Sequence, residues 1–241
     1  ARTLIAGELK IGIPDQTLSN VRIEGLYINS HLSACYHNDA NVEGLVVTKC
    51  YVNGNIRFNG TSTNTEISRC VVNGNIGGQN GWITASLQVS NTYVGGNFNT
   101  FSADCSVNAD HCIICGDNGC AILYTNCVLT NWYTPGSAIA DGSVVKNCLC
   151  YRGAPSGNKI VENCYVEDIS NMFTDAGNAG YSATRTFELQ QPDVWMGNDG
   201  TQVGIHGGMG FSKVPATPVV KNMKLNVEGK QLKVDYEAGV R

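Results

Sequence analysis

The sequence predicts an all-β chain, folded as a single-stranded right-handed parallel β-helix of about 8–10 coils with a C-terminal β-hairpin extension. Three observations predict this fold. A repeat of about 20 residues runs through most of the chain, one position of that repeat is mostly cysteine, and the composition is poor in charge but rich in glycine and asparagine.

The composition favours short strands joined by tight turns. Charged residues make up 15% of the 241 residues, against about 25% in typical proteins, and 28 residues are glycine. Glycine and asparagine tolerate the left-handed backbone of such turns, whereas a helical bundle needs long runs of helix formers. The net charge of −4 makes nucleic acid an unexpected partner, and no apolar run reaches the ~18 residues of a membrane-spanning helix.

The repeat is clearest in residues 52–56, whose sequence Val-Asn-Gly-Asn-Ile recurs at 72–76. The repeat unit around it begins with an apolar residue, two mostly polar residues and a cysteine. Two more residues follow, and the second of them is nearly always apolar. The cysteine slot, here called the anchor, falls at positions 26, 50, 70, 92, 112, 127, 148 and 164. The variable spacing excludes a left-handed β-helix built from strict six-residue repeats. The Leu-x-x-Leu-x-Leu frame of leucine-rich repeats is also absent, so a β-helix with loops of variable length is predicted.

Stacked coils place equivalent side chains in columns along the axis. Because side chains alternate along a strand, the anchor and the residue two positions later are both expected to point inward. The inward cysteines are expected to be Cys50, Cys70, Cys112, Cys127, Cys148 and Cys164. Asparagines at the strand ends are expected to hydrogen-bond the bends: Asn53, Asn73, Asn126, Asn147 and Asn163.

The repeated Asn-Cys-x-Val frame resembles the pectate-lyase-like superfamily of right-handed β-helices. The stretch 198–208, Asn-Asp-Gly-Thr-Gln-Val-Gly-Ile-His-Gly-Gly, is similar to the closing coil of bacterial secreted and cell-surface β-helix proteins. The resemblance covers about residues 20–210 and implies a secreted, periplasmic or cell-surface location. The chain begins Ala1-Arg2-Thr3 without a signal segment, and we expect an export signal to have been removed.

The pattern changes after the β-helix, predicted to span 1–212. Prolines at 215 and 218 interrupt it, and two alternating runs, 219–227 and 231–236, flank Glu228-Gly229-Lys230. This arrangement predicts a hairpin within a C-terminal extension, 213–241, that caps the last coil or packs along one side.

Six of the eleven cysteines fall in the anchor column, which favours buried thiols over a disulfide framework. A zinc site at Cys112-x-x-Cys115 with Cys120 and Cys127 is disfavoured, because two of the four should face inward on different coils, and no metal is expected. A local Cys115–Cys120 disulfide stays open, as does the state of Cys35 and Cys105.

No catalytic motif stands out in the sequence. A polysaccharide lyase needs a base and acidic groups that bind Ca²⁺, so Ca²⁺ is expected only for that activity. The candidates are Asp104, Asp110, His111 and Asp117, with solvated turn residues as the alternative interpretation. A glycoside hydrolase needs paired carboxylates. None of Asp141, Glu162, Glu167, Asp168 and Asp175 forms the expected Asp-Asp pair.

The residue after each anchor should point outward, yet this row is apolar: Tyr27, Tyr51, Val71, Tyr93, Ile113, Val128, Leu149 and Tyr165. Eight coils would make a stripe about 35 Å long. This row has three interpretations. Tyr51 and Tyr93 stack on sugar rings, another protein docks on the row, or the chain's own tail covers it. Trp82, Trp132 and Tyr133, in longer segments between strands, are further ligand-contact candidates.

The first functional expectation is therefore a non-catalytic extracytoplasmic β-helix protein that binds carbohydrate or a partner surface. The alternatives are a polysaccharide lyase or glycoside hydrolase acting on acidic or plant-type glycans, and a structural spacer within a larger cell-surface protein.

Overall fold

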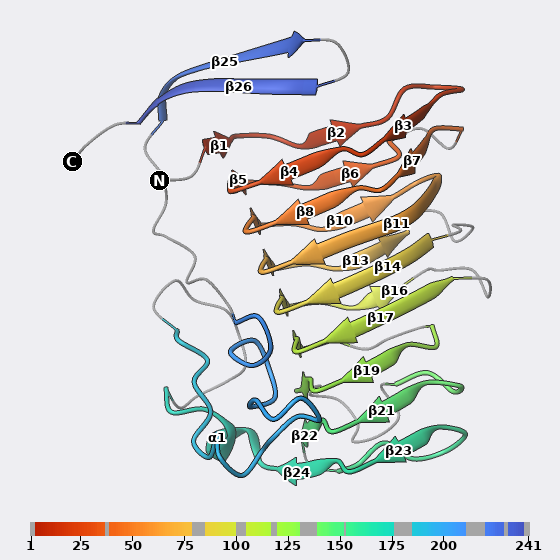
Figure 1. Ribbon diagram of the computed structural model, residues 1–241, viewed down its shortest axis with the longest axis vertical. Helices are drawn as coiled ribbons and strands as arrows, with labels where there is room; N and C mark the ends of the chain where they lie inside the picture. Colours follow the sequence, from red (N-terminus) through yellow and green to blue (C-terminus); the bar gives the residue numbers. More distant parts are fainter. Residues whose placement is uncertain are drawn as a thin grey trace.

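The computed structural model describes residues 3–36, 39–78, 85–99, 105–116, 120–130, 139–151, 153–175, 185–210, 220–228 and 231–238. These residues form a parallel β-solenoid of about seven turns, which confirms the predicted fold class (Figure 1). The number of turns is slightly lower than the 8–10 coils expected. One of its sheets has nine strands and another has five among the described residues.

Three parallel sheets run along the solenoid. Sheet A contains β1 (Thr3–Ile5), β5 (Leu26–Ile28), β9 (Tyr51–Val52), β12 (Val71–Val72), β15 (Tyr93–Val94), β18 (Ile113–Ile114), β20 (Val128–Leu129), β22 (Leu149–Tyr151) and β24 (Tyr165–Glu167). Sheet B contains β2 (Leu9–Ile11), β6 (Leu32–Ala34), β10 (Ile56–Phe58), β13 (Ile76–Gly78) and β16 (Phe98–Asn99). Sheet C contains β3 (Thr17–Ser19), β4 (Arg22–Glu24), β7 (Asn41–Glu43), β8 (Val46–Thr48), β11 (Thr61–Ser68), β14 (Ala85–Ser90), β17 (Ser106–Asp110), β19 (Leu123–Thr125), β21 (Val144–Lys146) and β23 (Ile160–Glu162).

The strand register stacks equivalent residues of the repeat. Val72 pairs with Val52 on one side and with Val94 on the other, and all three are fully buried. The anchor cysteines form the predicted internal file, and all eleven cysteines of the chain are free thiols. Five anchor cysteines are fully buried and Cys164, on the last coil, is half-buried. The prediction of a buried thiol column is confirmed.

The anchor side chains also hydrogen-bond, which explains why threonine can replace cysteine there. The backbone N–H of Cys50 donates to Cys70 Sγ at 3.4 Å, and that of Cys70 donates to Thr92 Oγ1 at 3.2 Å. In turn, Cys70 Sγ donates to the carbonyl of Ser68 at 3.2 Å, and Thr92 Oγ1 to that of Ser90 at 2.8 Å. A compact donor–acceptor side chain therefore satisfies buried backbone groups at each corner.

The residue before each anchor from Cys50 onward turns the chain from sheet C into sheet A with a positive φ of 44–55°. We call this row the corner ladder: Lys49, Arg69, Asn91, His111, Asn126, Asn147 and Asn163. Asparagine is common in the row because it tolerates the left-handed conformation. At another bend, Asn73 Nδ2 donates to Asn53 Oδ1 at 3.1 Å, so the asparagines lie at bends as predicted.

After β24 the chain leaves the stack. The helix α1 (Ile169–Met172) begins after Asp168, whose side chain accepts from Ser170 N–H, and residues 185–210 then run back along the outside of sheet A (Figure 1). We call 168–175 and 185–210 the cover segment. The expectation that 198–208 forms a closing coil is wrong, because this stretch contains turns and one antiparallel bridge, Met196–Gln202, instead of a parallel strand.

The predicted hairpin is present as β25 (Val220–Glu228) and β26 (Gln231–Ala238), which pair antiparallel. Its turn begins at Glu228, which pairs with Gln231. In the part of the chain that the structure describes, no helix has the length and apolarity needed to cross a bilayer.

Candidate functional site

The apolar row on the outside of sheet A is covered, as one of the three interpretations predicted. Its residues pack with the cover segment in a second hydrophobic cluster, outside the solenoid core. The cover contributes Ile169, Met172, Phe173, Phe187, Leu189, Trp195, Val203 and Ile205. This arrangement hides an apolar stripe that would otherwise face water.

Tyr51 and Tyr93 both belong to this outer cluster and are 8% and 2% exposed. The Tyr51 ring stacks on Tyr27 at a centroid distance of 4.4 Å, and the Tyr93 ring meets Phe187 at 5.1 Å. A sugar has no access to the Tyr93 ring face that Phe187 of the cover occupies, and the Tyr51 ring face is occupied by Tyr27. Trp82, Asp104, Asp117, Trp132 and Tyr133 lie outside the described residues.

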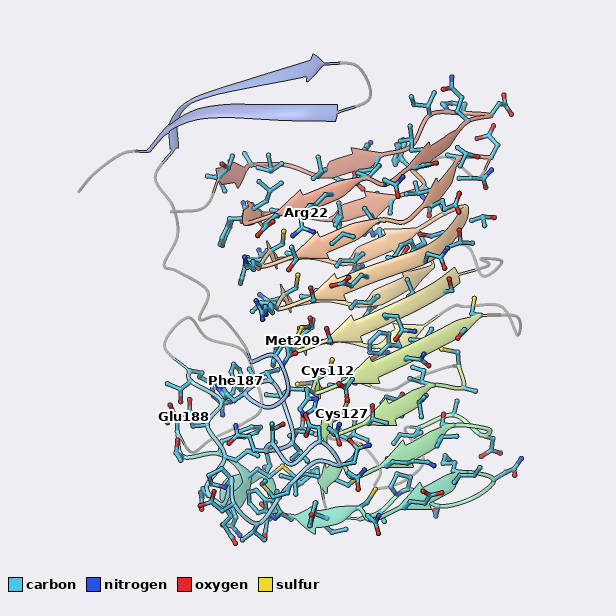
Figure 2. All side chains as sticks on the ribbon, viewed as in Figure 1. Arg22, Cys112, Cys127, Phe187, Glu188 and Met209 are labelled. Carbon is cyan, nitrogen blue, oxygen red and sulfur yellow. The ribbon has the colours of Figure 1, made fainter. Side chains whose placement is uncertain are left out.

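The corner ladder holds the cover segment in place. Arg69 Nη2 donates to the carbonyl of Met209 at 3.0 Å, and Asn91 Nδ2 donates to those of Ile205 and Gly207 at 3.0 and 2.7 Å. Asn126 Oδ1 accepts from the Asn198 backbone N–H at 3.0 Å. From Asn198 to Met209, the cover therefore contacts corner-ladder residues that lie progressively closer to the N-terminal coils. Figure 2 shows Phe187, Glu188 and Met209 beside sheet A.

His111 is the centre of this contact, and two of the catalytic candidates meet there. Its Nδ1 lies 2.9 Å from Asp110 Oδ2, and its Nε2 lies 3.1 Å from Thr201 Oγ1 and 3.4 Å from Asp199 Oδ2. The His111 side chain is only 2% exposed. A buried histidine is thus faced by one carboxylate from the solenoid and one from the cover.

Both carboxylates are held in the charged form. Burial alone would raise the pKa of Asp110, but hydrogen bonds from His111, Thr125 and Asn126 outweigh burial and hold that pKa below its usual value. For Asp199, burial is likewise outweighed, here by the backbone N–H and hydroxyl of Thr201 and by nearby His111, so its pKa is also lowered.

Two glycines of the cover enclose the imidazole. A Cβ on Gly207 would lie 2.4 Å from His111 Cδ2 and 1.8 Å from the carbonyl oxygen of Gln202, and one on Gly208 would lie 3.0 Å from Nδ1. The tail motif Gly-Ile-His-Gly-Gly therefore fits closely over the ring. Because both ring nitrogens of His111 are engaged and its ring is covered, this side chain holds the cover segment against the solenoid.

Polar groups that are open to solvent gather on the cover itself. A shallow, open pocket of about 490 Å³ is lined by Glu188, Pro192, Asp193, Met196, Gly200, Thr201, Gln202 and His206. His206 Nε2 donates to the carbonyl of Thr186, which orients the imidazole. A closing coil was expected at 198–208, and that expectation gave no sign of this pocket. Glu188 and Asp193 belong to no motif, and only the fold of the cover brings them into one pocket.

The cysteines do not build a metal site in the described residues. Cys112 points into the core, whereas Cys115 lies on the outer side, 3.5 Å from Tyr93 Oη. Cys120 packs against the inner core, so Cys115 and Cys120 lie in different clusters and both are free thiols. No group of three or more His, Cys, Asp or Glu residues in the described ranges is arranged to bind a metal ion.

Comparisons of the chain with protein-family models, with curated proteins and with solved structures gave no match. The features of the chain that bear on its function are therefore the cover segment and its pocket.

Proposed function

We propose that this chain is a non-catalytic β-helix protein that binds carbohydrate in the pocket of its cover segment. The single observation that supports this function most is the open pocket, where five side chains with hydrogen-bonding groups meet on a rigid scaffold. The resemblance of the chain to pectate-lyase-like β-helices, through the repeated Asn-Cys-x-Val frame, supports an extracytoplasmic, bacterial setting for this binding.

The chemistry of the pocket suits a sugar. The carboxylates of Glu188 and Asp193 accept hydrogen bonds from hydroxyls, and the Gln202 amide both donates and accepts. Pro192 and Met196 give apolar surface for the C–H face of a pyranose ring. An open, shallow pocket fits one or two sugar units of a longer chain better than a small ligand enclosed on all sides.

The solenoid supports binding by making the pocket rigid. Trp195, next to the lining residue Met196, is 4% exposed and packs in the outer cluster, and Val203, next to Gln202, is fully buried. Lining residues that alternate with buried residues keep their positions without a ligand, which lowers the entropic cost of binding.

A glycan array with the purified chain tests the proposal, followed by affinity measurements with each retained glycan. Asp193→Ala and Gln202→Ala should weaken binding at least about tenfold, equivalent to about 1.4 kcal/mol. Glu43→Ala, which removes an exposed acid on sheet C, should leave the affinity unchanged.

Retention of no glycan, or equal binding by native and Asp193→Ala protein, would refute the proposal. Release of shortened sugars by the native chain, abolished in Glu188→Gln, would instead establish the hydrolase alternative. The pocket contains two carboxylates, Glu188 and Asp193, and a glycoside hydrolase needs such a pair.

A further inference from the structure

Three thiols pack together where the thiol column reaches the last coil. Cys148 and Cys150, before and within β22, are 0% and 3% exposed, whereas Cys164, just before β24, is half-buried. The neighbouring Val166 belongs to an inward column yet is 49% exposed. In the described part of the chain, solvent therefore reaches the thiol column at this end of the solenoid.

Cys148 and Cys164 lie side by side, each immediately before a strand of sheet A, β22 or β24. Leu149 pairs in register with Tyr165, and the Tyr165 N–H donates to the Cys148 carbonyl at 2.8 Å. Paired strands lie about 4.8 Å apart, within the range of Cα separations that a disulfide spans. Both Sγ atoms point inward, where Cys164 Sγ lies 3.5 Å from the Val145 carbonyl. A bridge between them needs side-chain rotation but no rearrangement of the strands.

The surroundings favour the thiolate of Cys164. Hydrogen bonds from the Cys148 and Cys150 thiols lower the pKa of Cys164 strongly, against the opposing effect of burial. Two half-buried cysteines differ from it, because burial raises the pKa of Cys115 and raises that of Cys120 to about 11. Cys164 thus combines partial exposure with thiolate character, which are the two features of a reactive cysteine.

We propose that Cys164 is a redox-reactive thiol that forms a disulfide with Cys148 and so fastens the last coil to the solenoid. The Cys164 thiolate attacks one sulfur of a small-molecule disulfide, forms a mixed disulfide and releases one thiolate. The Cys148 thiol then loses its proton and attacks the Cys164 sulfur, and the second small thiol leaves. Two protein thiols are oxidised to one disulfide, and one small disulfide is reduced to two thiols.

Such a bridge would act where the fold is least supported. β24 pairs only with β22, and β23 only with β21, so among the described strands this coil has a neighbour on one side. Ile160, on β23, is 54% exposed. A covalent link between β22 and β24 restricts separation of the last coil and is expected to slow amide exchange in residues 160–167.

Oxidised glutathione is the probe for the test. Treatment of the folded chain should reduce the count of free thiols from eleven to nine, and peptide mass spectrometry should find Cys164 bridged to the peptide 147–152. Because that peptide carries both Cys148 and Cys150, variants identify the partner. The bridge should persist in Cys150→Ala and disappear in Cys148→Ala, where Cys164 should instead retain glutathione.

Cys50→Ala is the matched control, since Cys50 occupies the same column and is fully buried; this variant should form the bridge normally. Circular dichroism confirms that each variant is folded. A folded native chain whose Cys164 stays reduced, or a bridge from Cys164 to Cys150 that survives in Cys148→Ala, would overturn the proposal. Amide exchange in 160–167 that is equal before and after bridging would overturn the role in fastening the coil.

Discussion

At the scale of single residues, the corner ladder shows how one backbone position is used for two purposes. Every member turns the chain with a positive φ, but the side chain decides what docks there. Lys49 reaches Glu24 in an exposed ion pair at 2.7 Å, whereas Asn91 and His111 bind the cover segment. The buried side chains of Asn91, His111 and Asn126 are thus partnered by the cover, as most buried polar groups are.

Protonation of Asp110 is expected to loosen the cover. The pKa of this carboxyl is lowered in the folded state, so its stabilising effect is present above the unfolded value of about 3.9 and disappears as the pH falls through the lower folded value. Asp110→Asn should cost about 1 kcal/mol at pH 7, after allowance for its partial exposure, and progressively less as the pH falls below about 4.

Urea unfolding of both proteins between pH 7 and 2.5 measures this difference. Glu43→Gln, which removes one exposed charge on sheet C, is the control and should show the native midpoint at pH 7. A constant difference between native protein and Asp110→Asn across the whole pH range would contradict the assignment.

At the scale of elements, the cover segment depends on close approach to the solenoid. Gly204 has a φ of +79°, and a Cβ there would lie 2.9 Å from Val128 Cγ2. Gly197 similarly leaves room for the Asn126 side chain. The glycines of this tail therefore serve to bring an irregular segment onto a flat sheet, where any larger residue would hold it away.

Gly207→Ala should displace the cover around His111, because the new methyl group would overlap the Gln202 carbonyl and the imidazole. We expect a loss of about 1–3 kcal/mol in the free energy of unfolding and faster amide exchange in 198–208. Gly7→Ala is the control, since nothing lies within 4 Å of its added Cβ. Unchanged exchange in Gly207→Ala would show that the cover does not depend on this contact.

At the scale of the whole molecule, the solenoid distributes its stability among neighbouring coils. Each inner strand of sheet A pairs on both sides, and its inward side chains stack on those of the coils above and below. The stability of such a fold is the sum of contributions from single coils and from contacts between neighbours, so a central coil matters more than a terminal one.

Equivalent truncations along one inward column should therefore have unequal effects. Val72→Ala, at a fully buried site between β9 and β15, should cost about 1–3 kcal/mol. Val166→Ala, at the 49% exposed site on the last coil, should cost less than about 0.5 kcal/mol. Denaturant unfolding with a common baseline measures both, and equal costs would contradict the arrangement of coils.

The sequence by itself determined the solenoid, its inward columns and its hairpin. An exact pentapeptide repeat and a file of cysteines constrain the chain locally, since each coil repeats the packing of the one before. It also identified the apolar outward row, and a cover formed by the chain's own tail was one of the three interpretations of that row.

Only the tertiary structure decided what forms that cover and where the candidate site lies. Asp110 and His111 were visible in the sequence, but Asp199 and Thr201 meet them from about 90 residues away. The pocket of Glu188, Asp193 and His206 likewise depends on how an irregular segment folds back. Contacts between a repeat and a non-repeating tail follow no period, so no pattern along the chain predicts them.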